Sequence, residues 1–286
     1  MKPVRKAVFP VAGLGTRLLP ATKTMPKEML TVVDRPLIQY AVDEAREAGI
    51  EQIILVTGRG KSSLVDYFDL SFELEATMEK AGKSLDPLEP AKARSGEIVS
   101  VRQQQPLGLG HAVWCARDIV GDEPFAVLLP DDLMVGQPGA LRQMIDAYAD
   151  LGGNIVCAQE VAADKTGSYG IITPGKTSGA ATEVLGLVEK PKPADAPSRL
   201  GVVGRYILQP EVMDILGRGE RGAGGEIQLT DAMAQLIGKQ PFHALTVDAV
   251  RHDCGDKAGY VLANLAIALG RDDLRPKIEE FLASRG

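Results

Sequence analysis

The chain has 286 residues, an ordinary hydrophobic content of 45% and a formal net charge of −6 at pH 7. This length can bury a substantial core in one large domain, while the acidic balance argues against a nucleic-acid partner, which usually requires a basic face. Three distant cysteines without a C-x-x-C spacing, Cys115, Cys157 and Cys254, predict neither a disulfide framework nor a zinc site.

The apolar run that follows the basic N-terminus is too short to be a membrane anchor. Pro10 and Gly13 interrupt it, and no other stretch approaches membrane-spanning length. We therefore expect a cytoplasmic protein with no membrane partner.

The first predicted strand, over residues 8–12, leads directly into a glycine-rich loop. Gly13 and Gly15 allow the backbone to turn its N–H groups toward a ligand. Arg17 and Lys27 add two cations within the same short segment. This combination predicts a site for a polyanion such as a phosphate chain.

Two common glycine motifs do not fit the chain. The dinucleotide motif G-x-G-x-x-G requires a glycine where the chain has Leu18. A Walker loop could end at Gly60, Lys61 and Ser62, but its first glycine would fall at Leu55, inside a predicted strand. We interpret this Gly-Lys-Ser run as a strand-to-helix turn.

Strands and helices alternate through the first half. Strands are predicted over 53–56, 98–102, 125–129 and 154–161, and helices over 36–48, 112–119 and 137–151, while 72–94 are predicted to form a solvated helix followed by a loop. Such alternation predicts an α/β fold with a mixed, mainly parallel sheet flanked by helices. Ligands in these folds collect at the carboxyl ends of strands, where the glycine-rich loop lies.

In the second half of the chain, the apolar runs are shorter and do not alternate regularly with helices. Short apolar runs over 169–172, 184–189 and 200–208, separated by Gly, Pro and Lys, indicate antiparallel or mixed strands around a second ligand. A helix over 228–237, a strand over 242–247 and two tail helices follow. Apolar residues form one face of the first tail helix: Ala258, Val261, Leu262, Leu265 and Leu269. No internal repeat is visible.

A block beginning at Gln105 and Pro106 has the features of a base-binding site. Gly110 leaves room for a flat base against the backbone, and the Gln105 amide can pair with a pyrimidine edge. We interpret His111, a lone histidine that opens a helix, as structural.

Asp131 and Asp132 follow a buried strand directly. Adjacent carboxylates repel one another unless a cation or several donors lie between them, so the pair suggests Mg²⁺, with Asp131 as the better ligand. Taken alone, the pair is more typical of a turn that caps a helix, and only the other blocks of the chain favour a metal site.

Six blocks distributed along the chain resemble the sugar-nucleotide pyrophosphorylases. They read A-G-L-G-T-R, P-K-E-M-L, Q-P-L-G-L-G-H-A, L-P-D-D, E-K-P and H-D-C-G-D-K. The resemblance implies one Rossmann-like, glycosyltransferase-A-like nucleotidyltransferase domain over 1–286. Within it, 1–152 would form the nucleotide half, 153–255 the sugar half and 256–286 the C-terminal helices.

The resemblance also implies the site residues. Those for the nucleotide are Ala12, Gly13, Leu14, Gly15, Thr16, Arg17, Lys27, Glu28, Gln105, Pro106, Gly110, Asp131 and Asp132. Those for the sugar phosphate are Gly170, Glu189, Lys190, Val203 and Gly204. Asp131 and Asp253 would hold Mg²⁺, and the catalytic cations would be Arg17, Lys27 and Lys190.

The wording of these blocks is most similar to family members that convert UTP and glucose 1-phosphate into UDP-glucose and pyrophosphate. The second pKa of a phosphate monoester is about 6, so the sugar phosphate is already a largely ionised nucleophile at neutral pH and needs no general base. The resemblance further implies a homo-oligomer, a dimer or tetramer, with the C-terminal helices as its interface.

Three other functions are compatible with parts of the pattern. A thymidylyltransferase differs only by the thymine methyl, worth about 1–3 kcal/mol in a pocket. A metal-dependent glycosyltransferase that uses a nucleotide sugar would need an acceptor pocket and leaves A-G-x-G-T-R unexplained. A non-catalytic nucleotide-sugar sensor would be expected to lack one of the charged groups, but all are present.

Overall fold

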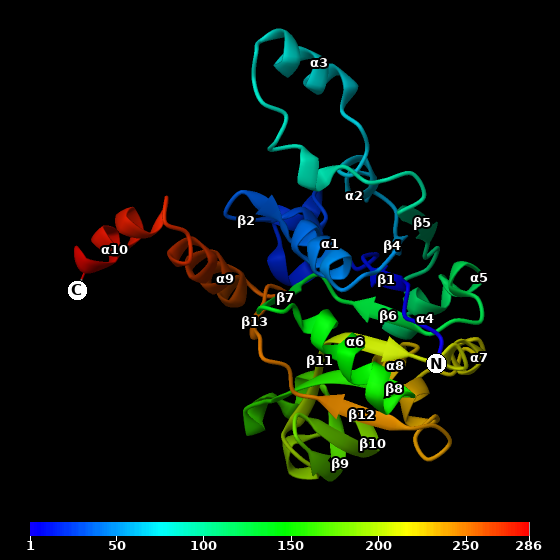
Figure 1. Ribbon diagram of the computed structural model, residues 1–286. Helices are drawn as coiled ribbons and strands as arrows, with labels where there is room; N and C mark the ends of the chain where they lie inside the picture. The colour runs from blue at the N-terminus through cyan, green and yellow to red at the C-terminus, as the bar shows by residue number, and fades with distance from the viewer. Residues whose placement is uncertain (286) are drawn as a thin grey trace.

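A mixed nine-stranded sheet runs through the molecule in the order β5-β4-β1-β6-β11-β8-β12-β10-β9 (Figure 1). The structure is a computed structural model that describes residues 1–285. The strands are β1 (Lys6–Pro10), β4 (Gln52–Thr57), β5 (Ile98–Arg102), β6 (Phe125–Leu128), β8 (Asn154–Glu160), β9 (Gly170–Ser178), β10 (Ala181–Glu189), β11 (Leu200–Leu208) and β12 (Phe242–Leu245). Only β10 and β11 run against the other strands of this sheet, within residues 1–285.

Helices cover both faces of the sheet. The helices α1 (Leu37–Glu47) and α6 (Ala140–Leu151) pack on one face, while α4 (Leu109–Trp114), α7 (Val212–Leu216) and α8 (Leu229–Ala234) pack on the other. Side chains alternate between the two faces of the sheet along β1. Phe9 packs in the core under α1 and α6, and Val8 packs in the core under α4, α7 and α8. A strand buried on both faces must be apolar throughout, which explains the continuous apolar run at its centre.

The predicted strands are all present, but several short elements were missed. A two-stranded ribbon joins β7 (Asp132–Val135) to β13 (Val250–Asp253), and α7 follows β11. The helix predicted over 112–119 is divided into α4 and α5 (Arg117–Val120). A ribbon between segments more than a hundred residues apart depends on its distant partner, so local pattern carries little signal for it.

Two parts of the chain extend from the body in Figure 1. One carries α3 (Phe72–Lys80) and follows α2 (Ser63–Asp66), whose Leu64 is buried in the core; the other comprises α9 (Lys257–Leu269) and α10 (Arg275–Ala283). The short hairpin of β2 (Thr31–Val32) and β3 (Arg35–Pro36) precedes α1. The apolar face predicted for α9 faces solvent, since Leu262 is 61% exposed. Within residues 1–285, no helix is long and apolar enough to cross a membrane.

Candidate active site

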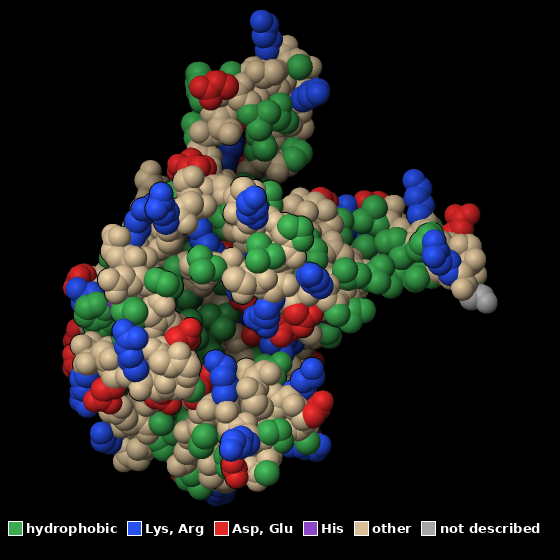
Figure 2. Space-filling model, turned by 180° about the vertical axis from the view of Figure 1, so that it is seen from behind, with side chains coloured by type: hydrophobic (Ala, Val, Ile, Leu, Met, Phe, Trp, Pro, Cys, Tyr) green, Lys and Arg blue, Asp and Glu red, His purple; other side chains and the backbone are tan. Residues whose placement is uncertain are grey.

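Two adjoining pockets open at the carboxyl ends of the central strands. The larger has a volume of about 540 Å³ and the smaller about 360 Å³, and Leu109 and Glu226 line both. Figure 2 shows a hollow in the middle of the face it presents, bordered by acidic and basic side chains. The two pockets therefore offer adjacent spaces for two ligands.

The smaller pocket lies between the glycine-rich loop and the start of α4. Most of the predicted nucleotide loop lines it, namely Ala12, Gly13, Leu14, Gly15 and Thr16, together with Pro106. Gly15 adopts a left-handed backbone with φ of 65°, which permits the turn. Gln105 is exposed and outside this lining, and Gln103 takes its place.

The α4 side of this pocket is fixed by close backbone packing. The amide of Gly110 donates to the carbonyl of Ile227 at 2.9 Å, and the amide of Ile227 donates to the carbonyl of Leu107 at 2.7 Å. A Cβ atom on Gly108 or Gly110 would lie 2.8 Å from that same Ile227 oxygen. Glycine is needed here for close approach, which is a structural reason for the L-G-L-G pattern.

Lys27 and Asp131 form an ion pair at the wall of the larger pocket, which Asp131 lines. The Lys27 Nζ lies 2.5 Å from the Asp131 Oδ2, and both side chains are largely buried. Burial lowers the pKa of Lys27, but the charges of Asp131 and Glu28 and the hydrogen bond to Asp131 together outweigh burial and raise it. Burial likewise raises the pKa of Asp131, and Lys27 reverses this so that the carboxylate titrates below its usual range. Both groups are charged at neutral pH.

Asp131, Asp253 and Arg17 converge on the backbone of Gly255. A Cβ atom there would lie 2.9 Å from Asp253 Oδ1, 3.1 Å from Asp131 Oδ2 and 3.0 Å from Arg17 Nη2. The Gly255 amide also donates to Asp253 Oδ1 at 2.9 Å. Two carboxylates that face one point suit Mg²⁺, which commonly takes one or two of them plus phosphates and waters. Within residues 1–285, no larger group of His, Cys, Asp and Glu is arranged to hold a metal.

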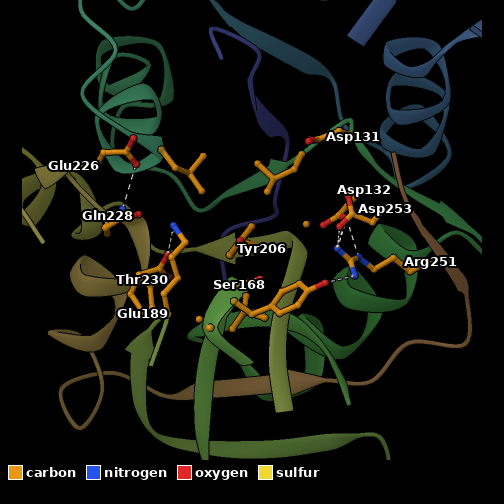
Figure 3. Close-up of a pocket in the computed structure, with 18 of the residues that line it drawn as sticks. Asp131, Asp132, Ser168, Glu189, Tyr206, Glu226, Gln228, Thr230, Arg251 and Asp253 are labelled. Atoms are coloured by element: carbon orange, nitrogen blue, oxygen red, sulfur yellow. Dashed lines mark hydrogen bonds and ion pairs between the residues drawn. The ribbon is translucent and has the colours of Figure 1, made fainter. Parts of the chain in front are cut away.

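Asp132 points elsewhere, into the interior beside Arg251 (Figure 3). The Arg251 Nε donates to Asp132 Oδ1 at 2.8 Å. Burial raises the pKa of Asp132 to about 6 even though Arg251 opposes the shift. A Cβ atom on Gly204 would lie only 2.5 Å from the Asp132 Cβ, so this glycine gives the aspartate its space.

The larger pocket contains most of the predicted sugar-phosphate residues. Gly170, Glu189, Lys190 and Gly204 line it, and the Lys190 Nζ lies 3.1 Å from Glu189 Oε1. The side chain of Val203 does not line this pocket. It is 2% exposed and packs in the core under α1 and α6. Because side chains alternate along β11, its neighbours on that strand face the pocket instead.

Several residues that line this pocket carried no recognisable sequence signal. Tyr169, Gln228, Thr230 and Arg251 all contribute to its wall. Thr230 closes against Gly170, where a Cβ atom would meet its Oγ1 at 2.9 Å. Arg251 alone could have been found, since period-2 alternation places it on the same strand face as Asp253.

One further predicted nucleotide residue, Glu28, is turned away from the cleft. Glu28 is 1% exposed and accepts a 2.8 Å hydrogen bond from Lys61 Nζ, so its carboxylate supports the loop from beneath. The Gly-Lys-Ser run is confirmed as a turn between β4 and α2. His111 lies 3.0 Å from Gln103 Nε2 and stacks on Trp114, as expected for a structural histidine.

Comparisons with known proteins agree with this arrangement. The family model of nucleotidyl transferases matches residues 6–268. A UTP–glucose-1-phosphate uridylyltransferase of Komagataeibacter xylinus is 55% identical over 90% of this chain and 91% of its own. One from Bacillus subtilis (strain 168) is 48% identical over 99% of this chain and 97% of its own.

Solved structures give the same grouping. A UTP-bound UGPase from Acinetobacter baumannii is 44% identical with a TM-score of 0.87, covering 98% of this chain and 99% of that one. A UDP-glucose pyrophosphorylase complexed with UDP-glucose is 43% identical with a TM-score of 0.84, covering 94% and 100%. The chain thus belongs to the nucleotidyl transferase family and groups within it with the bacterial UTP–glucose-1-phosphate uridylyltransferases.

Proposed function

We propose that the chain joins UTP and glucose 1-phosphate to give UDP-glucose and pyrophosphate. The observation that carries this proposal is the convergence of Arg17, Asp131 and Asp253 at one wall of the larger pocket, with Lys27 paired to Asp131, beside a second pocket lined by the glycine-rich loop. The relatives named above, which carry UTP, glucose 1-phosphate or UDP-glucose in their descriptions, support the choice of substrates.

The chemistry requires two anions to meet in line. A phosphate oxygen of glucose 1-phosphate forms a bond to the α-phosphorus of UTP as the bond to the departing pyrophosphate breaks. Lys190 would hold the incoming phosphate, while Lys27 and Arg17 would hold the triphosphate and the leaving pyrophosphate. None of these groups has to move a proton, since the nucleophile is already ionised.

Asp131 and Asp253 are the residues we assign to Mg²⁺. The ion would supply charge neutralisation for the triphosphate and its leaving group. Asp132 is assigned a supporting role, because its carboxylate is already paired with Arg251.

We also propose how the chain is organised around this site. A Rossmann-like nucleotide half (1–152) and a sugar half (153–255) would act as one glycosyltransferase-A-like domain. The exposed apolar face of α9, including Val261 and Leu262, would join copies of the chain into a homo-oligomer. Light scattering that gave the mass of a monomer at micromolar concentration would overturn the last point.

Pyrophosphate release with UTP, dTTP and CTP against glucose 1-phosphate, galactose 1-phosphate and N-acetylglucosamine 1-phosphate tests the function. We expect UTP with glucose 1-phosphate to give the highest kcat/KM. A preference for dTTP would favour the thymidylyltransferase alternative. Release of free sugar from UDP-glucose, without pyrophosphate chemistry, would favour a glycosyltransferase.

Base selection should depend on Gln103, whose amide lines the nucleoside pocket. Cytosine inverts the donor and acceptor of the pyrimidine edge and leaves buried polar groups unpaired, whereas the thymine methyl only adds bulk. We therefore expect UTP to be preferred over CTP by about a hundred-fold or more, and over dTTP by much less. Gln103→Leu should reduce the UTP/CTP ratio of kcat/KM, while the exposed Gln105→Leu should leave it unchanged. If Gln105→Leu lowered the UTP/CTP ratio and Gln103→Leu did not, Gln105 would be the residue that selects the base.

Lys190→Ala should act on the sugar phosphate and spare UTP. Its ammonium is the cation beside Glu189, at the far end of the cleft from the glycine-rich loop. We expect KM for glucose 1-phosphate to rise and kcat to fall, each by about tenfold or more, because the nucleophile loses its anchor and its alignment. Calorimetric titration should show UTP affinity within about twofold of wild type. Equal weakening of both ligands would contradict this assignment.

A further inference from the structure

We propose that Arg251 is a positioning residue that connects the carboxylates of the metal end of the cleft to the backbone that presents Lys190. The inference rests on the proposed function and assigns a role to a residue that takes no part in the chemistry above. The side chain of Arg251 is 11% exposed and lies beside Asp132 and Asp253, on the side of the pocket opposite Glu189 (Figure 3).

The first connection is to the carboxylates. Arg251 Nε donates to Asp132 Oδ1 at 2.8 Å, and Nη2 approaches Asp253 Oδ2 at 3.5 Å. Asp132 and Asp253 are opposite each other in the β7–β13 ribbon, so the guanidinium spans a register pair. A planar fork with several donors can hold both acids in fixed orientations, which a single ammonium cannot do.

The contacts of Arg251 distinguish Asp132, which has a structural role, from Asp131 and Asp253, which we assign to the metal. Asp132 is buried and needs a permanent counter-ion, because an unpaired buried carboxylate is costly. Arg251 is committed to Asp132 and makes no contact with Asp131, which pairs with Lys27 and faces the point above Gly255 together with Asp253. The orientation of Asp253 is then set on one side by the Gly255 amide and on the other by Arg251.

The second connection is to the sugar end. Arg251 Nη1 donates to the Tyr169 hydroxyl oxygen at 3.2 Å, and the guanidinium lies 5.4 Å from the centre of that ring. The Tyr169 carbonyl accepts a 3.0 Å hydrogen bond from the Lys190 amide. Lys190 has a φ of 48°, an uncommon left-handed conformation for a residue other than glycine, which the surrounding structure must maintain. A displacement of Tyr169 would therefore shift the backbone of Lys190 through this hydrogen bond.

The test uses variants that each remove one connection from the full-length protein. Arg251→Lys keeps the positive charge beside Asp132 and loses the fork. Tyr169→Phe keeps the ring and loses only the contact with Arg251. Arg271→Lys is the matched control, since Arg271 makes a comparable forked contact with Asp273 far from the cleft.

Two quantities are measured. The first is the affinity of the nucleotide-free protein for Mn²⁺, obtained from the electron paramagnetic resonance signal of free Mn²⁺. The second is KM for glucose 1-phosphate. We expect Arg251→Lys to weaken Mn²⁺ binding and to raise KM for glucose 1-phosphate, each by about tenfold. Tyr169→Phe should raise only that KM, by several fold, and Arg271→Lys should change neither quantity. Circular dichroism and thermal unfolding check that each variant folds.

The inference is overturned if Arg251→Lys leaves both quantities at their wild-type values, or if Tyr169→Phe leaves KM for glucose 1-phosphate unchanged. Tyr169→Phe decides the second connection even if Arg251→Lys fails to fold. Failure of the proposed function would look different, because the wild-type protein itself would then release no pyrophosphate from UTP and glucose 1-phosphate.

Discussion

Asp131→Asn and Asp253→Asn should each lower kcat about a thousand-fold, corresponding to about 4 kcal/mol of lost transition-state stabilisation. An amide keeps the shape of the side chain and removes the negative charge that a hard divalent cation requires. The two carboxylates face the same point, so the double variant should lose little more than either single variant. Pyrophosphate release at saturating Mg²⁺ measures the effect.

Asp256→Asn is the matched control for this pair. Asp256 belongs to the same H-D-C-G-D-K block, is exposed, and accepts a 2.9 Å hydrogen bond from the Gly259 amide as the N-cap of α9. Asparagine caps helices about as well as aspartate, so activity should remain within about twofold of wild type. Full activity of wild-type protein in excess chelator, or of either single variant, would exclude the assigned metal site.

Lys27→Met should change metal binding and nucleotide turnover in opposite directions. In the ligand-free protein Lys27 occupies Asp131, with a 2.5 Å contact that competes with any cation approaching this carboxylate. Without the ammonium, Mn²⁺ should bind the nucleotide-free protein about tenfold more tightly. The triphosphate loses a buried donor, so kcat/KM for UTP should fall about a hundred-fold, or about 2.7 kcal/mol.

The matched control for Lys27 is Lys23→Met, since Lys23 is an exposed cation four residues earlier in the same loop. It should leave both quantities near wild type, because a solvent-exposed charge is screened by water and salt. Electron paramagnetic resonance gives the Mn²⁺ affinity, and pyrophosphate release gives kcat/KM. If Lys27→Met weakened Mn²⁺ binding instead, the Lys27–Asp131 pair would not be a competitor of the metal.

The sequence determined those features whose cause is local. Glycines, prolines and cations within a few residues of one another predict a phosphate-binding turn, and the structure places Arg17 and Lys27 of that segment close to Asp131. Apolar runs of strand length between turn signals located every strand of the central sheet. Two adjacent acids at a strand end likewise placed Asp131 at the cleft.

Tertiary structure decided which side chain of each block faces the cleft. Gln103 and Gln105 have the same side chain, but only Gln103 lines the pocket, with its Nε2 held by the Gly108 carbonyl and His111, while Gln105 is exposed. Val203 points into the core because strand register selects one of two faces, and a shift by one residue would reverse the choice.

Tertiary structure also decided which charged side chains pair with one another. Glu28 and Lys61 meet beneath the loop, and Arg251 reaches Asp132 across a ribbon between segments 119 residues apart. A sequence records which ionisable groups exist, but their pairing depends on distances that only the folded chain sets. Coulomb energy varies with separation and burial, so the roles of Asp131, Asp132 and Asp253 could be distinguished only in three dimensions.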